Sequence, residues 1–127
     1  MPFDWKEYTD LADSLSTVNP AVCSKEAYLR TCASRYYYGV YGIINKEHNN
    51  RFNSPNDKYN RHEEVIRFYG RQADRTWKRV AANLGNLWDR RICADYKGYR
   101  PFSDVDCQEA SVYAQLILED LRVLGVI

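Results

Sequence analysis

The chain has 127 residues, a length that fits a single domain and allows a hydrophobic core to form without disulfides or metals. Its formal net charge is only +1, and no apolar run approaches the roughly 18 residues that a membrane-spanning helix needs. The first residues lack the charged and apolar regions of a secretory signal peptide. We therefore expect one cytoplasmic domain over residues 1–127, with no membrane partner.

Cysteine and histidine are too scattered to predict a metal site. The four cysteines form no C-x-x-C pair and fall within predicted helices, where thiols usually pack as small buried hydrophobes; they are Cys23, Cys32, Cys93 and Cys107. Neither of the two histidines, His48 and His62, belongs to a Glu-x-x-His pair. We expect reduced cysteines, no structural zinc and no cofactor.

The charges are unevenly distributed along the chain. Residues 51–91 hold ten Lys or Arg against five Asp or Glu, a local balance of +5 that leaves −4 on the remainder. Such a segment suits a basic face that meets phosphates or an acidic partner, although a solvated helix surface explains it equally well. The candidate RNA-binding residues of this segment are Arg61, Arg67, Arg71, Lys78 and Arg90.

The first two helices are predicted from apolar spacing and from their ends. Trp5, Leu11 and Leu15 belong to a short amphipathic helix. A second helix is expected to begin with Asn19 as N-cap and Pro20 in the first helical position, and to run to about residue 48. One face of it is apolar, and the other carries small residues beside an arginine, which lets a helix or a ligand approach closely: Tyr28, Thr31, Cys32, Arg35, Gly39 and Gly42.

The rest of the chain also reads as helical. Residues 49–60 hold five asparagines and a proline and are predicted to form a loop. Helices are expected over residues 61–72, 77–96 and about 103–124, the last beginning with a capping box formed by Ser103 and Asp106. No alternating strand pattern competes. The predicted architecture is an all-α, up-and-down bundle of four to five helices.

Arg91 lies on the apolar face of the fourth predicted helix. That face follows three- and four-residue spacing and continues onto Arg91, Ala94 and Asp95; its apolar members are Trp77, Val80, Ala81, Leu84, Leu87 and Trp88. An inward guanidinium must be paired or bind a ligand, because an unpaired buried charge costs several kcal/mol. The pattern therefore leaves two interpretations open: a structural Arg91–Asp95 pair, or a ligand site.

Three segments carry a resemblance to a known family: residues 33–41 (ASRYYYGVY), 61–68 (RHEEVIRF) and 91–96 (RICADY). They resemble segments of the HEPN-domain superfamily, small helical proteins found in prokaryotic toxin–antitoxin and antiviral defence loci. The first is similar to its S-R-x-Y-Y-x-x-F helix, and the other two are similar to the H-x-x-V-I-x-x-F and R-x-x-A-D-Y segments of one uncharacterised branch. The three segments occur in the same order as in that branch, and the resemblance covers about residues 20–124.

The resemblance implies a helical bundle that commonly dimerises through the helices carrying the arginine motif, and in many members a metal-independent endoribonuclease. In those enzymes the arginine stabilises phosphate and a histidine transfers protons. Arg91 matches the arginine, Ile92 replaces its polar neighbour, and Tyr96 stands at the histidine position, where an ordinary tyrosine pKa near 10 makes a poor base. Asp95 is expected to orient Arg91, and Tyr96 to donate a hydrogen bond or stack on a base.

Two more residues are candidates for the same cleft. His62 either lies near Arg91 and replaces the missing base, or caps and packs the third helix. Arg35 and the three tyrosines that follow it are candidates to line the cleft. The alternative, which the spacing favours for Tyr36 and Tyr37, is the core, and for Tyr38 it is the helix surface.

Two hypotheses for the function follow. The first is a HEPN-like protein that binds or cleaves RNA through Arg91, Asp95 and Tyr96. The second is a non-catalytic subunit that keeps the fold and binds a partner protein of its system through the basic middle region. We further expect either a heteromer or a homodimer; in the homodimer the fourth helices meet near Arg91, because their aromatic stripe exceeds what one thin bundle covers.

Overall fold

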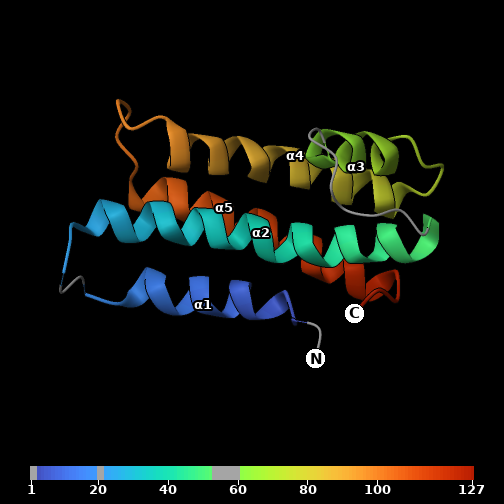
Figure 1. Cartoon of the computed structure of the whole chain (residues 1–127), viewed down its shortest axis with the longest axis horizontal. Helices are drawn as coiled ribbons and strands as arrows, with labels where there is room; N and C mark the ends of the chain where they lie inside the picture. The colour runs from blue at the N-terminus through green and yellow to red at the C-terminus, as the bar shows by residue number, and fades with distance from the viewer. Residues whose placement is uncertain (1–2, 20–21, 53–60) are drawn as a thin grey trace.

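The computed structural model describes residues 3–19, 22–52 and 61–127 as a bundle of helices (Figure 1). Its elements are α1 (Lys6–Thr17), α2 (Lys25–Phe52), α3 (Arg61–Gly70), α4 (Arg75–Tyr96) and α5 (Asp104–Val123). None of the residues in the described ranges forms a strand. The predicted all-α bundle is therefore confirmed.

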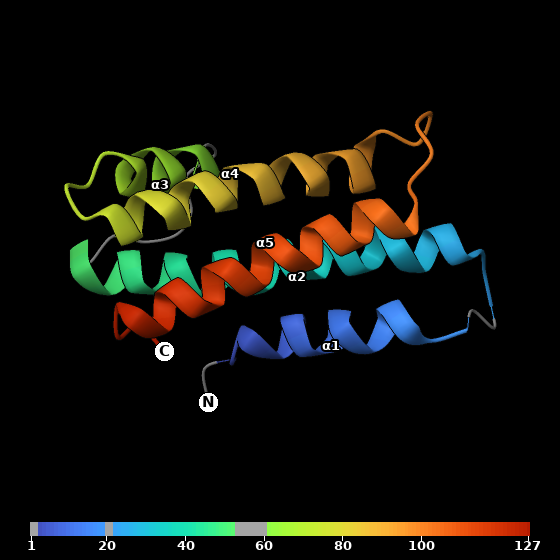
Figure 2. The same cartoon turned by 180° about the vertical axis from the view of Figure 1, so that it is seen from behind.

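The long helix α2 occupies the centre of the bundle and contacts each of the other helices. Figures 1 and 2 show α1 on one side of α2 and α4 on the other, with successive long helices running in opposite directions and the short α3 beside the beginning of α4. Within the described ranges, no helix is long and apolar enough to cross a membrane. The up-and-down order places the middle of α2 against the last turns of α4.

The prediction for the start of α2 was wrong. Asn19 precedes the helix as exposed, non-helical chain, and the helix begins at Lys25. The Ser24 hydroxyl accepts a hydrogen bond from the backbone N–H of Ala27 at 3.2 Å, which satisfies one of the free donors of the first turn. Pro20, the expected first helical residue, lies outside the described residues.

The predicted loop also begins too early, because residues 49–52 extend α2 by another turn. Arg51 in this turn pairs with Glu47 at 3.3 Å and lies over the Trp77 ring, 5.0 Å from its centroid. The pair with Glu47 supports the last turn of α2 from within the helix, and the contact with Trp77 holds this turn against α4, despite the poor helix propensity of asparagine. Residues 53–60, the rest of the predicted loop, lie outside the described ranges.

The small residues on the outer face of α2 receive α1. A Cβ atom added to Gly39 would lie 2.7 Å from Thr9 Cγ2, and one added to Gly42 would collide with the Trp5 ring. The close approach expected at these glycines is therefore made by a helix. Ala12 of α1 is fully buried in the same interface.

The apolar stripe of α4 is largely internal to one chain. Leu84 and Leu87 are at most 1% exposed and Trp77 is 5% exposed, because they pack against α2, α3 and α5. Trp88, the remaining aromatic residue of the stripe, is partly buried. Most of the apolar surface that motivated a homodimer is therefore covered within one chain, and the homodimer stays a prediction.

The predicted capping box of α5 is present, with the Ser103 N–H donating to Asp106 at 2.8 Å.

Candidate functional site

Arg91 projects from the last turns of α4 and is paired in the way its spacing predicts. Its Nε donates to Asp95 Oδ2 at 2.8 Å, and its Nη2 donates to the Tyr96 hydroxyl at 3.1 Å. The Arg91 side chain is 13% exposed and that of Asp95 is 28% exposed. The pair is therefore largely buried but still reaches the solvent, unlike a fully buried ion pair.

The middle of α2 extends this network. The Ser34 hydroxyl donates to Asp95 Oδ2 at 3.1 Å, and Arg35 Nη2 donates to Ser34 Oγ at 3.3 Å. One continuous chain of hydrogen bonds thus connects Arg91 on α4 to Arg35 on α2. Local sequence spacing contains no sign of this link, because it depends on how α2 and α4 are aligned.

Tyr38 lies between the two arginines. The guanidinium carbon of Arg91 is 5.0 Å from the centroid of the Tyr38 ring, and that of Arg35 is 5.4 Å from the same centroid. Both distances are within the range of cation–π attraction. We call Arg35, Tyr38, Arg91, Asp95 and Tyr96 the arginine–tyrosine cluster.

Each arginine of the cluster also contacts a second tyrosine ring. Arg35 lies over the ring of Tyr8 from α1 at 4.6 Å, and Arg91 lies over the ring of Tyr96 at 5.0 Å. Tyr96 is 68% exposed, and Tyr99, three residues later, is 80% exposed. Each arginine therefore contacts two aromatic rings, and one of these rings, Tyr96, faces the solvent.

His62 lies beneath this site rather than at the cap of α3. It is the second residue of α3, its Nδ1 is 2.7 Å from the Tyr37 hydroxyl, and its ring stacks on Tyr41 at 4.1 Å between centroids. Burial and the nearby charge of Arg91 both lower the pKa of His62. His62 is therefore neutral at pH 7, and it lies close enough to Arg91 for the guanidinium charge to affect its protonation.

The phenol of Tyr38 is protonated at neutral pH. Burial raises the pKa of Tyr38 above its ordinary value, and the positive charge of Arg91 opposes this shift only in part. Within the cluster, Tyr38 therefore acts as a neutral aromatic surface and a hydroxyl rather than as a base. The carboxylate of Asp95 is the one negative charge in the cluster.

The five predicted RNA-binding residues do not form one face. Arg61 is 2% exposed and donates through Nε to Asn45 Oδ1 at 2.9 Å, so that its guanidinium connects α3 to α2. This burial is incompatible with the expected contact to RNA. Arg90 lies between α4 and α5, 3.5 Å from both Asp106 and Glu109.

The other three predicted RNA-binding residues are exposed but lie outside the cluster. Arg67 pairs with Glu63 on α3, and Arg71 and Lys78 also face the solvent. The structure instead brings Arg35, His62, Arg91, Asp95 and Tyr96 into one region. All five were candidates for the catalytic cleft.

Sequence reasoning named Tyr38 as a candidate for the cleft but missed Ser34 and Tyr8. Ser34 lies four residues before Tyr38, so the two share one side of α2, a spacing that offers a weak signal. Tyr8 had no signal, since its place beside Arg35 depends on the packing of α1 on α2. In the described parts of the chain, no group of three or more His, Cys, Asp or Glu side chains is placed to hold a metal ion.

Comparison with known proteins adds no family to this description. No protein-family model matches the sequence, and the searches of curated proteins and of solved structures found no match. The chemistry of the site therefore rests on its own geometry. Two guanidiniums, one carboxylate and several tyrosine rings can bind a planar or anionic group at a half-buried position.

Proposed function

We propose that this chain is a HEPN-like protein of a prokaryotic toxin–antitoxin or antiphage defence system, and that it binds RNA through the arginine–tyrosine cluster. The observation that carries the proposal is the placement of Arg35 and Arg91 against the same Tyr38 ring. Two guanidiniums held by one ring and linked through Ser34 form a preorganised pair of donors. Phosphate oxygens are a natural acceptor for such a pair.

The charge of the cluster favours an anion. Among the described residues, Arg35 contacts Ser34 Oγ and two tyrosine rings, whereas Arg91 contacts Asp95. Two positive charges thus share one carboxylate, which leaves a net positive charge at a partly solvated site. A phosphate would neutralise it without displacing Asp95 from Arg91.

The exposed ring of Tyr96 extends the site toward a nucleobase. Tyr96 lies against Arg91 and is 68% exposed, and Tyr99, three residues later in the sequence, is 80% exposed. Stacking of a base on an aromatic ring contributes about 1–3 kcal/mol and tolerates any sequence. We therefore favour single-stranded RNA, whose bases are free to stack, over a duplex.

Cleavage is the second part of the proposal and depends on His62. Tyr96, at the motif's histidine position, donates or accepts a hydrogen bond beside Arg91 but has no neighbouring base among its described contacts. His62 is neutral and lies near Arg91, so it is the group suited to accept a proton. We further propose that the chain forms a homodimer, or a heteromer with a partner protein of its system. This part of the proposal is supported by the family resemblance alone.

The test is a titration of a fluorescently labelled single-stranded RNA oligonucleotide, without metal and at low salt, followed by anisotropy. Arg35→Gln should weaken binding about tenfold, since a hydrogen bond to a charged group contributes roughly 1.5–3 kcal/mol. Arg67→Gln removes an exposed arginine of α3 outside the cluster and is the matched control. Absence of binding to the wild-type protein, or equal losses in the two variants, would instead favour the role of a partner-binding subunit.

A further inference from the structure

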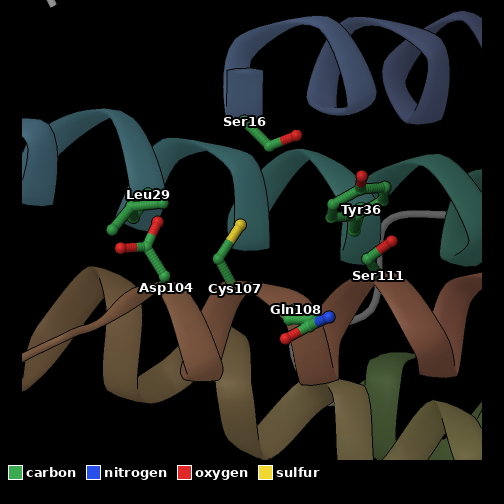
Figure 3. A pocket seen from close by; sticks show the side chains of 7 residues that line it. All are labelled: Ser16, Leu29, Tyr36, Asp104, Cys107, Gln108 and Ser111. Atoms are coloured by element: carbon green, nitrogen blue, oxygen red, sulfur yellow. The ribbon is translucent and has the colours of Figure 1, made fainter. Parts of the chain in front are cut away.

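The outer face of α5 carries a line of exposed apolar side chains. The inner face packs on the bundle through six buried residues: Cys107, Ala110, Ala114, Ile117, Leu118 and Leu121. Figure 3 shows part of this inner side, where Cys107 and Ser111 point toward α2 and line a cavity of about 240 Å³. On the outer side, four large apolar residues are exposed: Val105 at 61%, Val112 at 52%, Leu116 at 42% and Val123 at 76%. We call these four residues the α5 stripe.

The α5 stripe follows a single direction along the helix. Successive residues of an α-helix are about 100° apart around its axis, so the spacings within the stripe place all four side chains within about 20° of one line. The same face holds a hollow of about 300 Å³, lined by Val105, Gln108, Glu109, Val112 and Tyr113. Figure 2 shows α5 in front of α2, with none of the other described helices drawn over it. The described parts of the chain therefore leave this apolar face uncovered.

The α5 stripe has the same pattern in both directions along the helix. Val105 and Val123 lie nine residues on either side of Ala114. Val112 and Leu116 lie two residues on either side of the same alanine. A second α5 that runs antiparallel along this face therefore places each apolar side chain opposite another one. A twofold axis at Ala114 relates the two helices, as a symmetric dimer built from one surface requires.

The charges at the ends of the face also suit a second copy. Asp104 and Arg122 lie on one edge of α5, and both are exposed. Antiparallel pairing brings Asp104 of each copy near Arg122 of the other, with an offset of two residues, about 3 Å along the helix. Opposite charges therefore meet at both ends of the contact.

Glu119 is the charged side chain that a second copy must accommodate. It is exposed, and antiparallel pairing places it opposite Glu109 of the second copy. Arg90 Nη1 lies 3.5 Å from Glu109 Oε2, so a guanidinium of the same copy compensates this carboxylate. Glu119 therefore faces an ion pair rather than an isolated negative charge.

We propose that the α5 stripe binds the α5 stripe of a second copy of this chain, in an antiparallel twofold dimer centred at Ala114. The apolar side chains of both copies are removed from water in this contact, which provides the driving force for association. The contact lies on α5, whereas the resemblance implies dimerisation through the helix that carries the arginine motif, which is α4. The stripe shares no residue with the arginine–tyrosine cluster, and the proposal does not rest on RNA binding.

Sedimentation of the full chain over a micromolar dilution series tests the dimer. We expect a monomer–dimer equilibrium for the wild-type protein. Leu116→Glu should raise its dissociation constant by about tenfold or more, because a charge is placed at the desolvated centre of the contact. Leu11→Glu is the matched control, since Leu11 is 45% exposed on α1, outside the α5 stripe, and should dimerise like the wild-type protein. Circular dichroism checks that both variants keep their helical content.

Disulfide cross-linking tests the register without placing a charge in the contact. Cys23 is exposed, so the experiment uses a Cys23→Ser background. Under mild oxidation, the double variant Val105→Cys/Val123→Cys should form a covalent dimer, because the two positions face each other across the contact. Either single variant should stay uncross-linked, since its two copies lie about 27 Å apart along the helix, far beyond the roughly 7 Å between Cα atoms that a disulfide spans.

Three results would overturn the proposal. A wild-type protein that stays monomeric throughout the dilution series would leave the α5 stripe to a partner of different sequence. A dimer that Leu116→Glu leaves unchanged would use another surface. Cross-linking of either single cysteine variant as fast as the double variant would contradict the antiparallel register.

Discussion

Arg61 and Arg91 show how the same side chain serves two purposes in one bundle. Arg61 is 2% exposed, and its guanidinium donates to Asn45 and Asn49 of α2 while pairing with Glu64. Arg91 is partly open to the solvent, pairs with one carboxylate and otherwise lies against tyrosine rings. The first arginine is enclosed by its acceptors and joins α3 to α2. The second is oriented by its contacts but keeps a side for a ligand.

The largest expected difference between the two arginines is in stability. Arg61→Ala should lower the free energy of unfolding by about 3 kcal/mol, since it leaves the acceptors of a buried charge unpaired. Chemical denaturation followed by circular dichroism measures this change. A loss below about 1 kcal/mol, typical of an exposed residue, would show that Arg61 is not structural.

Arg91→Ala should change stability little and RNA affinity strongly. Its ion pair still reaches the solvent, with the two side chains 13% and 28% exposed, so stability should fall much less than in Arg61→Ala, by about 1 kcal/mol. RNA affinity should fall about tenfold, and any RNA cleavage without metal should be lost, because a charged donor to phosphate is removed. Anisotropy titration and gel analysis of the RNA provide the two readouts. Wild-type affinity in this variant, or its unfolding, would return Arg91 to a structural role.

Salt dependence sharpens the comparison further. Each arginine that contacts phosphate releases condensed counterions, so Arg35→Gln should reduce the slope of log affinity against log salt by about 0.7 for single-stranded RNA. Arg67→Gln, outside the cluster, should leave the slope unchanged. Titrations between about 50 and 200 mM salt cover the steep range. Identical slopes in the two variants would contradict a specific role for Arg35.

The smallest expected effect is on the pH dependence of folding stability. The pKa of His62 is lower in the folded chain than its ordinary value, so the folded state binds its proton less readily than the unfolded state. The contribution of His62 to the free energy of unfolding is therefore fully present above about pH 6.5, the ordinary histidine pKa. It is lost as the pH falls toward the lower pKa that His62 has in the folded state.

His62→Gln should reduce this loss without removing it. The pKa of His48 is also lowered by burial, so the second histidine contributes in the same direction. Melting temperatures of the wild-type protein and of His62→Gln, measured between pH 7 and 5, provide the comparison. An unchanged pH profile in His62→Gln would mean that its ring is not desolvated.

Periodic, local signals in the sequence predicted the all-α bundle and the number of its helices. They also gave the Arg91–Asp95 pair as one of two interpretations. The start of α2 could not be predicted, because Asn19 and Ser24 are both good caps, and their local sequence does not decide between them. Likewise, the charge of residues 51–91 does not reveal which side chains share a face. Burial of Arg61 and the pairing of Arg90 with α5 follow from helix packing alone.

The surroundings of Arg91 show the same limit. Arg35 and Arg91 were expected to line one cleft, but each was identified from the pattern of its own helix. The link through Ser34 and the shared Tyr38 ring depend on the alignment of α2 with α4, which no spacing within one helix determines. Sequence reasoning therefore identified the charged residues of the site but not the contacts that make it one site.

The most direct test of this joint site is a double-mutant cycle on RNA affinity with Arg35→Gln, Arg91→Gln and the double variant. If both arginines bind one phosphate, the effect of the double substitution should differ from the sum of the single effects by more than about 0.5 kcal/mol. Losses that add within that margin, or no loss in either single variant, would contradict the claim that Arg35 and Arg91 form one anion-binding site.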